Sequence, residues 1–102
     1  MTTIDSECCA PFLKALADKT RWRIVVELLA APMTVSELAE RLKVSQYNIS
    51  KHLRILREAG MVVSARQGKH IQCRIMSGFR RNVAKNKNQL DLGCCVFRFD
   101  KD

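Results

Sequence analysis

The chain has 102 residues, a formal net charge of +8 and 47% apolar residues, which suits one small globular domain over residues 1–102 and excludes a disordered chain. No apolar run is long enough to span a bilayer, and the start of the chain lacks a secretory signal, so we expect a cytoplasmic protein with no membrane partner. Neither a glycine-rich phosphate loop nor a cluster of carboxylates is visible, which argues against an enzyme.

Two helices are predicted in the first third of the chain. Apolar residues recur at helical spacing between Ile4 and Ala17, which indicates a first helix over residues 4–17. The run Asp18-Lys19-Thr20 interrupts this pattern. Thr20 can cap the second helix, which is predicted over Arg21–Ala30.

The next two helices are separated by a very short turn. Thr34 and Glu37 have the spacing of a capping box and predict a short helix that ends at Leu42. After the turn, Ser45 is placed to cap a longer helix over Gln46–Ala59, whose apolar residues all fall on one side.

The pattern then changes from helix to strand. Gly60 stands where a left-handed residue would end the helix. Met61–Arg66 and His70–Ile75 are predicted as two strands, joined by a hairpin turn at Gln67-Gly68-Lys69.

The last quarter of the chain gives a weaker pattern. One more helix is predicted from about Phe79 to Lys87 or beyond. The tail Leu90–Phe99 alternates apolar and other residues around Gly93, so extended structure is at least as well supported there as helix.

Two helices on a short turn followed by a hairpin predict a winged helix-turn-helix, a mainly α fold with a small β-hairpin. The helix-turn-helix covers residues 34–59 and the wing covers residues 61–75. Because only one side of the helix over Gln46–Ala59 is apolar, its other side is free to enter the major groove of DNA.

The distribution of charge favours the same partner. Residues 1–40 hold four basic and six acidic residues, whereas residues 41–81 hold ten basic residues and one acid, Glu58. The remaining residues hold four bases and three acids. A positive field confined to the predicted helix-turn-helix and wing attracts a polyanion such as double-stranded DNA, although such charge can also be a solvated surface.

The candidate DNA-binding side chains are polar or basic and lie at the start of the longer helix or around the hairpin tip, where they can bond base edges or phosphates. They are Ser45, Gln46, Tyr47, Asn48, Ser50, Lys51, Arg54, Arg66, Lys69 and His70. His52 stands beside Leu53 and is interpreted as a packed, hydrogen-bonded histidine and not as a catalytic one.

The runs LKALADKTRWRIVVELL and VSELAERLKVSQYNISKHLRILREAGMVVSARQGKHIQCRI, between Leu13 and Ile75, resemble the arsenical-resistance repressor family, the ArsR/SmtB group. The resemblance implies a homodimer that binds a pseudo-palindromic operator and leaves it when an inducer binds. It also implies dimerisation through the first and last helices, here about residues 4–17 and 78–99. By the same resemblance Gln46, Tyr47, Ser50 and Lys51 read the DNA.

Five cysteines remain to be explained. Two metal sites that recur in this family look absent, because Val35–Leu42 holds no cysteine and neither histidine lies on the last predicted helix. Thiolates bind soft ions, and three of them suit As(III) or Sb(III). We therefore expect a metalloid site formed by Cys94, Cys95, Cys8 and Cys9, with no cofactor required for DNA binding. If the first helix packs beside the C-terminal segment of a partner, Cys8 or Cys9 can meet Cys94 and Cys95 across a dimer.

Other interpretations of the cysteines stay open. Cys73 lies between apolar strand residues and is best explained as part of the core. The terminal cysteine pairs could instead oxidise to a disulfide and act as a thiol-redox or reactive-sulfur switch. A DNA-binding regulator without any ligand is the third possibility.

Overall fold

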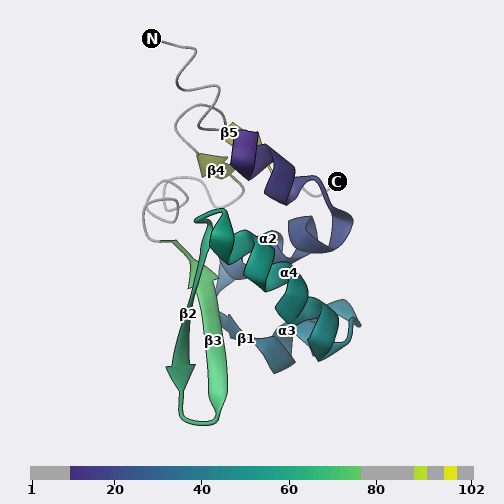
Figure 1. Cartoon of the computed structure of the whole chain (residues 1–102), viewed down its shortest axis with the longest axis vertical. Coiled ribbons are helices and arrows are strands. Elements are labelled where there is room, and N and C mark those ends of the chain that lie inside the picture. The colour runs from purple at the N-terminus through teal and green to yellow at the C-terminus, as the bar shows by residue number, and fades with distance from the viewer. Residues whose placement is uncertain (1–9, 77–88, 92–95, 99–102) are drawn as a thin grey trace.

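The computed structural model describes residues 10–76, 89–91 and 96–98. A helix covers residues 10–16. It is followed by α2 (Lys19–Ala30), β1 (Met33–Thr34), α3 (Val35–Leu42), α4 (Gln46–Glu58), β2 (Val62–Gln67), β3 (His70–Ile75), β4 (Gln89–Asp91) and β5 (Val96–Arg98). The hairpin of β2 and β3 projects beyond the helices (Figure 1). The predicted winged helix-turn-helix, mainly α with a small hairpin, is confirmed.

The second helix begins two residues earlier than predicted, so the assignment of Thr20 as its cap is wrong. Asp18 adopts an extended backbone and accepts a hydrogen bond from the backbone N–H of Arg21 at 3.0 Å. An aspartate is at least as good a cap as a threonine, and here it satisfies a free N–H of the first turn. Lys19 and Thr20 therefore lie inside α2.

Both predicted caps of the helix-turn-helix are confirmed. Thr34 Oγ1 accepts from the N–H of Glu37 at 3.1 Å, and Glu37 Oε1 accepts from the N–H of Thr34 at 2.8 Å. Ser45 Oγ accepts from the N–H of Asn48 at 3.2 Å. These local bonds fix where α3 and α4 begin, on either side of a three-residue connection.

The connection between α3 and α4 turns through a left-handed residue. Lys43 has φ 59° and ψ 45°, and the N–H of Val44 bonds the carbonyl of Ala39 at 3.1 Å. This is the bond of a Schellman-type helix end, whose left-handed position is usually a glycine. Because Lys43 carries a Cβ, the turn is strained at this residue.

The end of α4 forms the same motif with the glycine in place. Gly60 has φ 83°, its N–H bonds the carbonyl of Arg57 at 2.9 Å, and the N–H of Met61 bonds that of Leu56 at 3.1 Å. This confirms the predicted end of α4, which falls at Glu58 with Ala59 as cap. The motif sets the direction in which the chain enters the hairpin.

The hairpin pairs β2 with β3 over six residues and adds β1 at the other edge of β3, giving the strand order β1-β3-β2. Cys73 lies opposite both Met33 of β1 and Ser64 of β2. Gly68, with φ 64°, is the first of two turn residues, the position where a type II′ hairpin needs a positive φ. The two-residue strand β1 was not predicted, since so short a segment carries no periodic signal.

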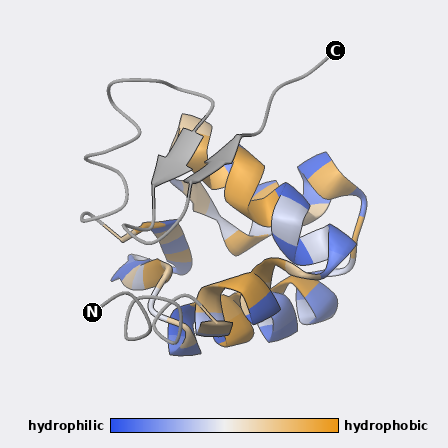
Figure 2. Cartoon of the chain, turned by 90° about the horizontal axis from the view of Figure 1, so that it is seen from above, coloured by the Kyte–Doolittle hydropathy of each residue, from blue (hydrophilic) through white to orange (hydrophobic). Residues whose placement is uncertain are grey.

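One apolar core joins the four described helices to the base of the hairpin. No polar or charged side chain is buried among the described residues, and hydrophobic and hydrophilic residues alternate along each helix (Figure 2). The residues exposed to 1% or less of their surface are Ile24, Val25, Leu28, Leu38, Ile49, Leu53, Leu56, Met61, Val62, Cys73 and Ile75.

The described part of the C-terminal tail is extended. β4 pairs with β5 in antiparallel register, with Leu90 opposite Phe97. The helical alternative for the tail is wrong at these residues, which pair with each other as two antiparallel strands. The predicted helix from Phe79 to Lys87 lies outside the described residues.

Replacing Lys43 with glycine is expected to stabilise the protein. The strain of a left-handed L-residue, about 1–2 kcal/mol, exceeds the extra chain entropy that a glycine loses, about 0.5–1 kcal/mol. Urea unfolding of Lys43→Gly should therefore show a free energy of unfolding higher by about 0.5–1 kcal/mol. Lys51→Gly, inside α4, is the matched control and should lose about 1 kcal/mol. A destabilised Lys43→Gly would contradict the strain at this turn.

Removing the cap of α2 is expected to destabilise the protein in a pH-dependent way. The backbone N–H of Arg21 holds the pKa of Asp18 below its ordinary 3.8, and Arg21 and His52 charges act in the same direction. The stability that the carboxylate contributes is thus present above pH 3.8 and is lost as pH falls through the lowered value. Asp18→Ala should lose about 1 kcal/mol at pH 7. In thermal melts from pH 7 to pH 2.5, the difference in stability between wild type and Asp18→Ala should narrow below about pH 4. A constant difference would exclude the charge as its source.

Candidate nucleic-acid interface

The longer helix of the helix-turn-helix is buried on one side only. Ile49, Leu53 and Leu56 are exposed to 1% or less of their surface and pack against α2, α3 and the base of the hairpin. The opposite side of α4 faces solvent. All seven candidate residues on this side of α4 are exposed. They are Ser45, Gln46, Tyr47, Asn48, Ser50, Lys51 and Arg54.

The N-terminal end of α4 is an electropositive, open surface. Tyr47 exposes 77% of its surface, the most of any large apolar or aromatic residue described. The first turn of α4 has no acidic residue to offset the positive end of the helix dipole. Ser45 Oγ uses one lone pair to accept the capping hydrogen bond from the backbone N–H of Asn48. Its hydroxyl hydrogen stays free to donate, so Ser45 can cap the helix and still bond a phosphate.

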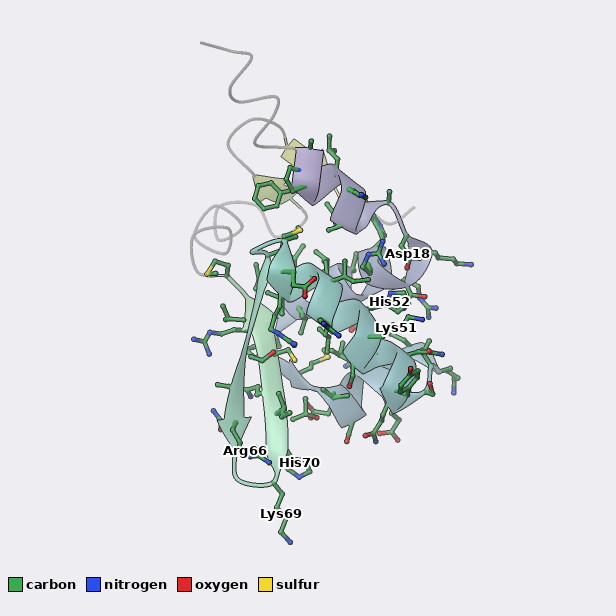
Figure 3. The ribbon with its side chains drawn as sticks, viewed as in Figure 1. Asp18, Lys51, His52, Arg66, Lys69 and His70 are labelled. Carbon is green, nitrogen blue, oxygen red and sulfur yellow. The ribbon has the colours of Figure 1, made fainter. Side chains whose placement is uncertain are left out.

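The hairpin tip carries the second group of candidates. Arg66, Lys69 and His70 are all exposed, and Figure 3 shows them at the far end of β2 and β3, away from the helices. Arg66 lies opposite Ile71, whose side chain is itself 44% exposed. A projecting, positive tip of this kind can contact phosphates or the minor groove.

One predicted contact residue has a partner that sequence reasoning missed. Arg54 Nε lies 3.3 Å from Glu58 Oε2 one turn further along α4, with both side chains about two-thirds exposed or more. The spacing i,i+4 could have revealed this pair. Such an exposed pair contributes little to stability, so Arg54 can exchange its carboxylate for a phosphate at small cost.

The inward-facing polar residue of α4 is His52, and the structure confirms that it is packed and hydrogen-bonded. Its side chain is 17% exposed, and its Nδ1 lies 3.2 Å from Arg21 Nη1 and 3.8 Å from Asp18 Oδ2. Figure 3 shows Asp18 and His52 close together. Arg21 and Asp18 were not predicted here, because a contact over 31 residues leaves no local pattern in the sequence.

Cys73 is a core residue, as predicted. It is fully buried, and its Sγ lies 3.5 Å from Ser64 Oγ. Burial raises the pKa of the Cys73 thiol, which keeps it protonated and unreactive at neutral pH. Cys8, Cys9, Cys94 and Cys95 lie outside the described residues, so the metalloid site stays a prediction.

The described part of the chain offers neither a metal site nor a membrane-spanning helix. Residues 10–76 and the strands β4 and β5 contain no group of three or more histidine, cysteine or acidic residues that could hold a metal ion. No helix within these residues has the length and apolar character needed to cross a membrane.

Comparisons with known proteins agree with this geometry. A family model described as "Bacterial regulatory protein, arsR family" matches residues 18–64. The transcriptional regulator NmtR of Mycobacterium tuberculosis is 38% identical over 71 residues, 67% of this chain and 59% of that regulator. The arsenical resistance operon repressor of Escherichia coli is 41% identical over 63 residues, 61% of this chain and 54% of that repressor.

A solved structure extends the match over the fold. The ArsR-like transcriptional regulator from Rhodococcus sp. RHA1 superposes with a TM-score of 0.67 and 38% identity, covering 83% of this chain and 78% of that one. The chain spans between half and three fifths of the length of the curated relatives named above. These proteins are named as regulators or repressors, in agreement with the prediction of a regulator and not an enzyme. The chain therefore belongs to the ArsR family of bacterial regulatory proteins.

Proposed function

We propose that this protein is a DNA-binding transcriptional repressor that places α4 in the major groove of an operator and the β2–β3 tip on the neighbouring backbone or minor groove. The observation that carries this proposal is the one-sided burial of α4, which leaves Gln46, Tyr47 and Lys51 exposed near its start. Polar side chains can bond base edges there, while the basic ones bond phosphates.

The operator-bound form is proposed to be a homodimer. The helix over residues 10–16 supports this, because Leu13 exposes 47% of its surface on a helix whose Ala15 and Leu16 are buried. A second copy would cover this apolar side chain, and two copies of α4 would then read two half-sites. The interface that we propose also takes in residues outside the described ranges, within about 78–99.

Two substitutions in α4 should separate phosphate binding from base reading. Lys51→Ala is expected to weaken binding to all DNA sequences alike and to lower the salt dependence by about one counterion. Gln46→Ala is expected to lose about 1–3 kcal/mol on the operator and little on unrelated DNA. Fluorescence anisotropy on DNA upstream of the protein's own gene, at several salt concentrations, measures both effects.

The control for these substitutions is Lys19→Ala, an exposed lysine of α2 that lies outside the proposed interface. It should bind the operator with nearly unchanged affinity. Wild-type protein that binds its upstream DNA no better than unrelated DNA would contradict operator recognition. Equal losses in Lys51→Ala and Lys19→Ala would show that only overall charge matters.

We further propose that a thiol-binding inducer, arsenite or antimonite, releases the DNA. The support is chemical: two adjacent cysteine pairs can supply three sulfur ligands, and one relative is named for arsenical resistance. Neither His52 nor Cys73 competes for the ion, since the first is held by Arg21 and the second is buried. A redox switch of the same cysteine pairs, and a regulator without a ligand, are the alternatives.

Titration of arsenite into the protein–DNA complex should release the DNA, whereas Cys94→Ser/Cys95→Ser protein should stay bound. A hundredfold loss of affinity corresponds to about 2.7 kcal/mol of differential binding between the two conformations. Cys73→Ala is the matched control and should still respond. Unchanged release from the double variant would sink the role of this pair. Release by a mild oxidant but not by arsenite would favour the redox alternative.

A further inference from the structure

Arg21 lies at the meeting point of three helices. It belongs to the first turn of α2, whose cap is Asp18. Its Nε donates to the carbonyl of Ala15 at 2.5 Å, in the last turn of the helix over residues 10–16. Its Nη1 lies 3.2 Å from Nδ1 of His52 on α4. One guanidinium thus bonds both the first helix and the helix that carries the proposed DNA contacts.

The fork geometry of arginine is what allows this arrangement. A guanidinium donates from several nitrogens held in one plane and accepts no hydrogen bond. The bond to His52 therefore requires that Nδ1 of the imidazole carries no proton and acts as the acceptor. A lysine ammonium at the same place has one nitrogen and cannot occupy both the Nε and Nη1 positions.

We propose that Arg21 is a positioning residue for DNA binding. Its hydrogen bonds to Ala15 and His52 form a lock that holds α4 against the first helix, so that the exposed side of α4 keeps the orientation needed to enter the groove. The inference rests on the proposed DNA-binding function. His52 immediately follows Lys51, so the ring that the lock holds and a proposed DNA contact are adjacent on one helix. Movement of the first helix would reach α4 by this route.

Asp18 offers the His52 ring an alternative hydrogen-bond partner to Arg21. Among the described residues, two charged side chains face the His52 ring, Arg21 and Asp18, both from the start of α2. When Nδ1 gains a proton it can no longer accept from Arg21, whereas it can donate to the Asp18 carboxylate, now 3.8 Å away. Histidine is the side chain that changes its charge between pH 5 and 8. Acid is thus expected to open the lock.

The first experiment compares Arg21→Lys with Arg21→Gln in DNA binding at pH 8. Both variants should bind the operator about tenfold more weakly, because each loses the fork, although Arg21→Lys keeps the charge. Lys19→Gln removes a charge from the same turn of α2 and should bind like wild type. Arg21→Lys with wild-type affinity would overturn the lock, since charge alone would then account for Arg21.

The second experiment substitutes the other partner. His52→Asn keeps an acceptor near the position of Nδ1, whereas His52→Gln places its amide near the position of Nε2. At pH 8, His52→Asn should keep operator affinity within about twofold, and His52→Gln should lose about tenfold. Far-UV circular dichroism and thermal melts establish that both variants fold. Equal affinities for these two folded variants would contradict the proposed bond.

The direction in which DNA affinity changes with pH distinguishes the opening of the lock from a simple charge effect. Protonating a histidine near a polyanion raises affinity, but opening the lock lowers it. The chain has two histidines, so the profile is measured in a His70→Gln background that leaves His52 alone. Operator affinity should fall as the pH is lowered from 8, and His52→Asn in this background should abolish the fall. Affinity that rises as pH falls would overturn the proposal.

A measurement without DNA separates this inference from the proposed function. A double-mutant cycle of Arg21→Gln and His52→Leu in urea unfolding at pH 8 should show non-additive losses of stability. Protein that binds no DNA but shows this coupling would disprove DNA binding while keeping the contact. Protein that binds its operator but shows additive losses would disprove the lock alone.

Discussion

The placement of α4 depends on three apolar side chains, Ile49, Leu53 and Leu56, which are almost completely buried against the rest of the core. Their spacing puts them on one side of a 13-residue helix. Burial of each such side chain contributes about 1.5–3 kcal/mol, so rotating α4 about its axis would be costly. Because the apolar side of α4 is buried, its polar side faces solvent. The packing of the apolar side therefore sets the position of every proposed DNA contact on this helix.

The two ends of α4 fix the directions of the turn that precedes it and of the hairpin that follows it. Ser45 fixes its start after a strained left-handed turn at Lys43, and the Schellman motif at Gly60 fixes its end. Met61, which closes that motif, is itself fully buried. The hairpin therefore leaves the core in a fixed direction, with its basic tip carried outward on six paired residues per strand. Local hydrogen bonds thus determine the distance between the two proposed DNA-binding elements.

Polar contacts are few in this core, and this gives the Arg21–His52 contact its weight. No polar or charged side chain of the described residues is fully buried, and the helices are held mainly by apolar packing. Apolar packing has no preferred direction of contact, whereas a hydrogen bond at 3.2 Å is directional. A bond from α2 to α4 therefore adds a directional constraint to the orientation that the apolar contacts of α4 set.

Local patterns in the sequence determined much of this structure. The capping box at Thr34, the serine cap of α4 and the glycine that ends it were all predictable, because each depends on residues within one turn. The choice of Asp18 over Thr20 was not, since two acceptors two residues apart compete and the position of the first helix decides between them. The hairpin and its charge followed from alternation and composition.

Only the tertiary structure decided which side chains meet. The two-residue strand β1 exists because β3 offers a free edge to it, and no periodicity marks it in the sequence. Cys73 is buried because its side of β3 packs on the apolar core formed with the helices, whereas Arg66 is exposed because the hairpin runs past the core. Arg21 and His52 are brought together by helix packing across 31 residues. Sequence alone fixes local hydrogen bonds and faces, but long-range contacts depend on how those faces pack.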